Sequence, residues 1–221
     1  MRRSYVESHV GLPESFRLAM KWAGTGAPVT VLAPSTRAVE ESPSLAKSGL
    51  PIGTTGNRHS RYTARPRSGT VIGWCLNLEE ILELEQDAEL DALVIVQCHK
   101  AHAPWITAHN AELLGGERIT PVPEGSPAIK AMVEGISGIA VVNQGLVDSR
   151  ERSAAVQALT FLRDRGHKLI PEQLVVEAIR RGWAGRSPLD LADLAKQLNA
   201  GKSLRFQQRI NPKMLDEWSS S

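Results

Sequence analysis

Four short runs of apolar residues, rich in the β-branched residues valine, isoleucine and threonine, stand out along the chain. Such runs are typical of strands that are buried on both faces of a parallel sheet. They cover residues 28–33, 70–75, 91–97 and 138–143. Between the second and third runs, leucine and isoleucine recur at helical spacing after Asn77, and glutamates fill the other positions. A strand, a helix and a strand in this order form a βαβ unit, whose two strands lie parallel.

Helical periodicity covers most of the remaining chain, with apolar residues at steps of three and four. The segments with this pattern are residues 12–22, 104–114, 127–134, 148–165, 171–181 and 188–198. The pattern therefore predicts a three-layer α/β fold with a mostly parallel, Rossmann-like sheet. We expect the α/β domain to cover residues 1–147. Residues 148–221 then form a helical C-terminal region, either a subdomain of its own or a further layer of the same domain.

One long segment, residues 35–68, fits neither pattern. It is rich in serine, threonine, glycine, proline and arginine, and only residues 37–41 have helical character. A structureless loop of this length is uncommon inside a compact domain and is usually functional or mobile. We therefore expect a long basic loop at this place in the α/β domain.

The composition is that of an ordinary globular protein, with 221 residues, 42% hydrophobic and 23% charged, and a formal net charge of +2. No apolar run is long enough to cross a bilayer, and no apolar stretch follows the two arginines near the N-terminus. The two cysteines, Cys75 and Cys98, form no C-x-x-C motif, which favours free thiols. These features predict a cytoplasmic protein without a membrane partner.

The small net charge conceals an uneven distribution along the chain. Residues 1–68 hold ten Lys and Arg against four Asp and Glu, whereas residues 69–149 hold three against twelve. Residues 150–221 are basic again, with thirteen against eight. The two basic flanks could complement the acidic middle internally, or they could together form a basic face that meets phosphate.

Arginine is concentrated in residues 57–67, which hold four arginines, a histidine and a tyrosine and no acid. A guanidinium matches the geometry of a phosphate group, and an aromatic ring between arginines can stack on a base. The C-terminal tail repeats this composition, and on a helix its basic residues would share one face. The predicted phosphate-binding residues are Arg58, Arg61, Arg65, Arg67, Lys202, Arg205 and Arg209. The alternative for the tail is a basic helix that lies against the acidic middle segment.

A second group of reactive side chains follows the third predicted strand, where Cys98, His99 and His102 stand close together in the sequence. A thiolate with imidazoles suits zinc binding or covalent catalysis. Their spacing fits no standard zinc motif, so we predict no metal and no cofactor. These three residues remain candidates for a catalytic site, with ordinary surface histidines as the alternative.

The ends of the predicted strands carry further polar residues, and α/β sheets bind ligands at the carboxyl ends of their strands. An anionic ligand would meet Ser35, Thr36 and Arg37 after the first strand and Asn143 after the fourth. The chain contains neither a dinucleotide-binding glycine motif nor a P-loop. The alternative is that these residues only form connecting loops.

A set of positions in the second half begins with Gly69 to Trp74, includes Pro104-Trp105 and Gly182-Trp183, and closes on Gly201-Lys202 and Arg205. Together these positions resemble an uncharacterised family of bacterial and phage α/β proteins. The resemblance covers about residues 69–205. This family has no established activity, so the resemblance implies an α/β fold and assigns no role to any residue.

Three functions remain open from the sequence. The favoured one is a non-enzymatic protein that binds phosphate-bearing partners, nucleic acid or nucleotide, through its arginine-rich loop and its basic tail. The second is a small enzyme that uses the Cys/His group at the strand ends. The third is an assembly or interaction protein, whose partner is another protein or a second copy of this chain.

Overall fold

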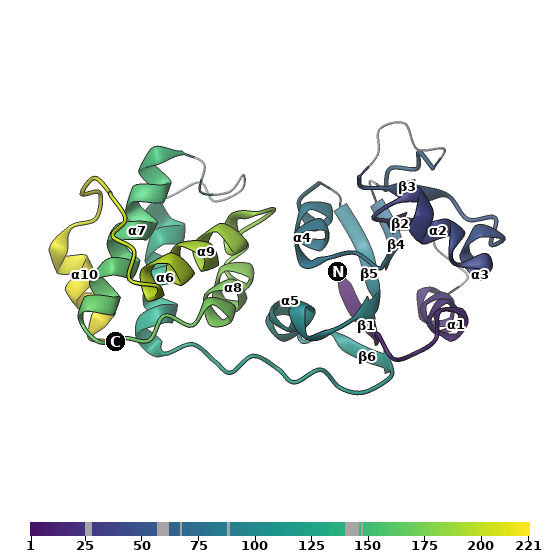
Figure 1. Ribbon diagram of the computed structural model, residues 1–221, viewed down its shortest axis with the longest axis horizontal. Coiled ribbons are helices and arrows are strands. Elements are labelled where there is room, and N and C mark those ends of the chain that lie inside the picture. Colours follow the sequence, from purple (N-terminus) through teal and green to yellow (C-terminus); the bar gives the residue numbers. More distant parts are fainter. Residues whose placement is uncertain (25–27, 57–61, 67, 88, 140–145, 147) are drawn as a thin grey trace. The chain divides into compact units, whose positions relative to one another are not determined.

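The computed structural model describes residues 1–24, 28–56, 62–66, 68–87, 89–139, 146 and 148–221. These residues form two compact units, Met1–Pro121 and Val122–Ser221, which are described separately below (Figure 1). The division does not coincide with the boundary that we expected after residue 147. The helix before that boundary, α6 (Pro127–Ile139), packs against the helices that follow it, so it belongs to the second unit.

The first unit is built on a six-stranded sheet in which every pair of neighbouring strands is parallel. Its strand order is β3-β2-β4-β5-β1-β6. The strands are β1 (Arg2–Glu7), β2 (Val29–Ala33), β3 (Ile52–Thr54), β4 (Ser68–Trp74), β5 (Glu89–Cys98) and β6 (Glu112–Gly115). The central strands β4 and β5 are almost wholly buried, as their apolar sequences predicted. The prediction of a three-layer α/β fold with a parallel sheet is confirmed.

Helices cover both faces of this sheet (Figure 1). One face carries α1 (Leu12–Ala23), α2 (Thr36–Glu40) and α3 (Pro43–Ala46), and the other carries α4 (Leu78–Asp87) and α5 (Ala103–His109). Right-handed crossovers place helices on opposite faces when the chain winds in opposite directions along the sheet. The connections β1–β2 and β2–β3 run in one direction along the sheet, and the connections β4–β5 and β5–β6 run in the other. Neighbouring strands therefore send their loops to opposite faces at two places, between β2 and β4 and between β1 and β5.

Three parts of this unit differ from the sequence prediction. The strand β1 was not predicted, because the arginines, serine and glutamate among its six residues break the apolar pattern. The helix predicted over residues 104–114 is wrong beyond His109, since Asn110 adopts a left-handed conformation with φ 52° and the chain continues as β6. The predicted long loop 35–68 contains α3 and β3 in addition to α2, which covers most of the residues with expected helical character.

The second unit is all helical in its described residues. It contains α6, α7 (Ser149–Asp164), α8 (Pro171–Arg180), α9 (Ser187–Asn199) and α10 (Pro212–Ser219). A single hydrophobic cluster joins them, with Met132, Leu159 and Leu191 fully buried. The helices predicted over residues 148–165, 171–181 and 188–198 are confirmed. No helix in the described part of the chain is long and apolar enough to cross a membrane.

One prediction for the second unit is wrong. Gly138 and Ile139 were expected to open a fourth strand but complete the helix α6 instead, while residues 140–143 of that strand lie outside the described residues. Near the C-terminus, α10 packs against α6. A Cβ atom at Gly135 would stand 1.9 Å from Cζ2 of Trp218, so the absence of a side chain on α6 lets the indole ring lie against its backbone.

Candidate functional site

The basic residues of the C-terminal tail lie on an exposed segment without regular structure, residues 202–209, which we call the basic strap. Lys202, Arg205 and Arg209 therefore do not lie on a helix, the conformation in which they would have shared one face. Figure 1 shows the strap leading from α9 to α10. The side chains of all three basic residues are exposed, and so is the ring of Phe206, at 41%.

Both ends of the strap are attached to the helical unit. The backbone N–H of Lys202 donates to the carbonyl of Gln197 (3.0 Å) at the end of α9. At the other end, the buried side chain of Gln157 on α7 receives the backbone N–H groups of Arg209 (2.8 Å) and Ile210 (2.9 Å). The amide nitrogen of Gln157 donates to the carbonyl of Ile210 at 3.0 Å. Since Leu204 also packs against the core, the strap has a defined path.

The cations of the strap differ in their surroundings from most arginines of the same unit. Arg163, Arg165 and Arg181 each form an ion pair with an acidic residue. Lys202 and Arg205 form none with a described residue, and the guanidinium of Arg209 donates only to the neutral side chain of Gln207. The strap therefore presents positive charge that no acid of the described structure neutralises.

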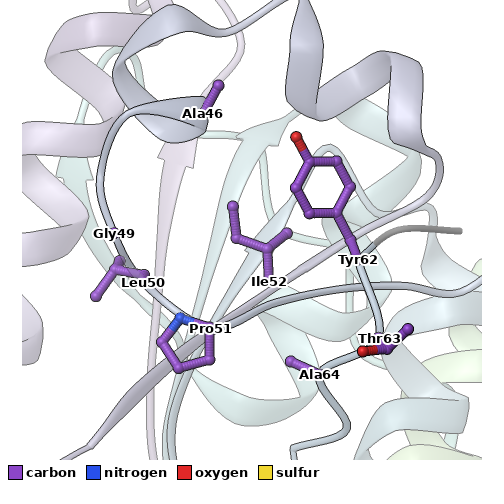
Figure 2. A pocket seen from close by; sticks show the side chains of 8 residues that line it. All are labelled: Ala46, Gly49, Leu50, Pro51, Ile52, Tyr62, Thr63 and Ala64. Atoms are coloured by element: carbon purple, nitrogen blue, oxygen red, sulfur yellow. The ribbon is translucent and has the colours of Figure 1, made fainter.

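The arginine-rich loop is described only in part. Arg58, Arg61 and Arg67 lie outside the described residues, and Arg65 is exposed and donates to the carbonyl of Thr54 (3.0 Å). An open pocket of about 410 Å³ lies beside this loop, next to the edge strand β3 (Figure 2). It is lined by Ala46, Gly49, Leu50, Pro51, Ile52, Tyr62, Thr63 and Ala64. No charged side chain is among these lining residues, so the pocket by itself offers no counter-charge to a phosphate.

The two cysteines are free and poorly suited to nucleophilic attack. Cys98 is fully buried, its thiol lies 3.7 Å from the carbonyl oxygen of Ile95, and burial together with the negative charge of Glu7 raises its pKa. Burial also raises the pKa of Cys75 to about 11. Because the thiolate is the reacting species, both residues are almost entirely in the unreactive thiol form at neutral pH.

The histidines that follow Cys98 hold the chain together locally. The ring of His102 is buried, accepts the backbone N–H of His99 at Nδ1 (3.1 Å) and donates from Nε2 to the carbonyl of Leu76 (2.9 Å). Burial lowers the pKa of His102, so the ring is neutral. His102 thus links the end of β5 to the end of β4. Among the residues that the structure describes, no three His, Cys, Asp or Glu side chains are grouped as metal ligands.

The described residues among the other predicted ligand-binding positions, Ser35, Thr36 and Arg37, lie in and around α2. Ser35 caps α2, where its hydroxyl accepts the backbone N–H of Ala38 (3.2 Å), and Thr36 is the first residue of that helix. Arg37 pairs with Glu41 one turn further on (2.6 Å) and is 85% exposed. Asn143 lies outside the described residues.

One polar group at the carboxyl edge of the sheet was not predicted. Glu7 ends β1 and is buried, and His9, two residues later, places Nδ1 2.7 Å from the Glu7 carboxylate. The missed strand explains the missed pair, because without β1 nothing marked these residues as standing at a strand end. The only signal in the sequence was a glutamate and a histidine two residues apart, which is common in surface loops.

The fold defines a chain with two parts, an α/β unit with a parallel sheet and a helical unit with an exposed basic strap. The helical part has a counterpart among known families: residues 126–219 match the model of a domain of unknown function (DUF1889). The match covers all five described helices of the second unit and supports the resemblance to an uncharacterised family. No curated protein and no solved structure matches the chain.

Proposed function

We propose that this protein binds phosphate-bearing partners, and nucleic acid in particular, through the basic strap of its helical unit. The observation that carries the proposal is the combination of three exposed cations, Lys202, Arg205 and Arg209, with a backbone path that Gln157 fixes. Nucleic-acid binding depends on cations that can replace the counterions around phosphates. Cations that are already paired with acids of the same protein serve this purpose less well.

The side chains of the strap suit a single strand. Arginine forms two parallel hydrogen bonds to a phosphate group, and an exposed aromatic ring such as Phe206 offers a face on which an unpaired base can stack. Stacking of this kind contributes about 1–3 kcal/mol per base. Because the strap is already ordered, binding does not have to supply the free energy of ordering it.

That the arginine-rich loop of the α/β unit forms a second contact with phosphate remains a prediction. The enzyme hypothesis has less support than binding, because the thiol of Cys98 is buried and His99 and His102 serve backbone hydrogen bonds. A Cys/His enzyme needs a thiolate within reach of its base and open to its substrate.

The test is oligonucleotide binding by the full chain at low salt. Binding to a labelled single strand and to the matching duplex is measured by fluorescence anisotropy. The strap variant replaces Lys202, Arg205 and Arg209 together with glutamine. The control variant replaces three cations that have ion-pair partners, the exposed Arg17 and Lys196 and the partly exposed Lys130, and so removes the same charge.

We expect the strap variant to bind at least tenfold more weakly than the wild type, which corresponds to about 1.4 kcal/mol. The control variant should stay within about twofold, a difference of about 0.4 kcal/mol. Equal weakening of both variants would show that only net charge matters. An absence of binding by the wild type at low salt would refute the proposal. Native mass spectrometry of the same samples reports self-association, the third hypothesis.

A further inference from the structure

The carboxyl ends of β1 and β5 lie side by side at one of the two places where neighbouring strands send their loops to opposite faces of the sheet. Glu7 of β1 is in register with Cys98 of β5, and the backbone N–H of Ser8 donates to the carbonyl of Cys98 at 2.8 Å. Loops that leave neighbouring strands toward opposite faces open a crevice between them, and α/β proteins bind their ligands there. The residues just beyond these two strand ends are therefore candidates for ligand binding.

Glu7 is a buried carboxylate, 5% exposed, that the chain itself keeps ionised. It accepts hydrogen bonds from the hydroxyl of Ser8 (2.9 Å), the backbone N–H of His9 (3.0 Å) and Nδ1 of His9 (2.7 Å). Burial by itself would raise the pKa of Glu7. The hydrogen bonds from His9 and Ser8 outweigh burial and hold the pKa below its ordinary value of 4.5.

This carboxylate fixes the proton of His9. An ionised carboxylate can only accept, so Nδ1 of His9 carries a proton, and in the neutral ring Nε2 then carries the lone pair. The side chain of His9 is 89% exposed, which leaves Nε2 open to a ligand.

His99, at the end of the neighbouring strand, has the opposite arrangement. Its Nδ1 accepts the backbone N–H of Ala101 (3.3 Å), so in the neutral ring the proton is on Nε2. Its side chain is exposed, as is that of Lys100. The edge thus offers a proton acceptor on His9, a donor on His99 and a positive charge on Lys100, while its acid, Glu7, is occupied internally.

Backbone strain is concentrated at the same edge. Cys75 (φ 55°) and Gln97 (φ 68°) are left-handed residues other than glycine, and they stand at the ends of the adjacent strands β4 and β5. The side chain of Gln97 donates to the carbonyl of Val10 (2.9 Å) and so fixes the loop just after His9. Strain of this kind persists where the surrounding structure enforces it, most often at ligand sites.

We propose that this edge is a small-molecule site for an oxyacid, a ligand with an ionisable hydroxyl on a phosphate or carboxylate group. The O–H proton of the ligand moves to Nε2 of His9, and the electron pair of the broken bond stays on the ligand oxygen. Glu7 is the positioning residue for His9. The donor on His99 and the ammonium of Lys100 hold the resulting anion. The site belongs to the α/β unit and does not depend on the basic strap.

The first experiment uses inorganic phosphate as the probe, because near neutral pH it carries both a transferable proton and anionic oxygens. The full chain is labelled with ¹⁵N-histidine and titrated with phosphate at constant ionic strength. We expect His9 to start as the Nδ1–H form and to shift saturably toward the imidazolium, while the Nε2 signal of the neutral His99 responds over the same range of phosphate concentration and His167 stays unchanged. An Nε2–H form of His9 without ligand would overturn the proposal, and so would shifts shared equally by His167.

Substitutions separate the site from general anion binding. His9→Asn and Lys100→Gln should each weaken phosphate binding at least fivefold, whereas the matched pair His167→Asn and Lys168→Gln should leave it unchanged. Equal affinities in all four variants would refute the site. Glu7→Gln should return His9 to a mixture of both neutral forms, and retention of a pure Nδ1–H form would show that Glu7 does not position the ring.

Discussion

Replacing Gln157 with leucine tests whether this one side chain holds the basic strap in place. The two side chains are similar in size, so the core volume changes little, but all three hydrogen bonds to the strap are lost. A hydrogen bond contributes about 1 kcal/mol net to a folded protein. The variant should therefore destabilise the attached strap by about 3 kcal/mol relative to the detached strap.

The assay is amide hydrogen exchange at Arg209 and Ile210, because the backbone N–H groups of these two residues donate to the side-chain oxygen of Gln157. A loss of about 3 kcal/mol raises the detached population, and with it the exchange rate at these two amides, by about a hundredfold. The oligonucleotide affinity should also fall, although every cation is kept, because binding must then order the strap.

A matched control is Gln197→Leu, which removes a half-buried glutamine of α9 whose side chain makes one bond to the carbonyl of Asp193 (3.3 Å). It should leave exchange at Arg209 and Ile210 within about threefold. The reasoning is refuted if Gln157→Leu changes these amides no more than the control does. It is refuted equally if all amides of the helical unit accelerate together, because that result means global destabilisation.

Three further predictions concern packing and protonation. Gly135→Ala displaces the indole of Trp218 and overpacks this contact, so the free energy of unfolding, measured by urea denaturation, should fall by about 3 kcal/mol; a loss under about 1 kcal/mol contradicts the contact. Alkylation of Cys75, whose pKa is about 11, should accelerate about tenfold per pH unit through pH 9; a plateau below pH 9 contradicts it. Burial disfavours ionised Glu85, but the hydrogen bond and charge of His109 and of Arg3 outweigh burial and keep its pKa below 4.5. The unfolded state thus binds this proton more readily, and stability present above pH 4.5 is lost as the pH falls through the folded pKa. Glu85→Gln should make the free energy of unfolding fall less steeply as the pH is lowered into the acid range, and an unchanged pH dependence contradicts this prediction.

The sequence predicted best where one local pattern decided the structure. The unit β4-α4-β5 follows from two apolar runs around an amphipathic helix, because burial on both faces demands apolar residues and one-sided burial demands helical spacing. The strand β1 could not be predicted from its own sequence, which contains arginines, a serine and a glutamate. Its position in the sheet depends on pairing with the distant strands β5 and β6. With β1 missed, the Glu7–His9 pair could not be placed at a strand end.

The basic strap shows a different limit of the sequence. Its cations were predicted to be exposed and available for phosphate, and the described residues place them on the surface. The steps of three and four between these basic residues fit a helix, yet the strap has no regular structure. What decides the conformation is a glutamine on α7, more than forty residues earlier in the chain, and no local pattern reports such a partner.

The most direct test of the central proposal is the salt dependence of binding to a labelled single-stranded oligonucleotide. Each phosphate that a protein cation neutralises adds about 0.7 to the slope of log affinity against log salt concentration. The variant that replaces Lys202, Arg205 and Arg209 with glutamine should lose a slope of about 2 relative to the wild type. Equal slopes in the two proteins would show that these cations do not contact phosphate and would contradict the proposed function.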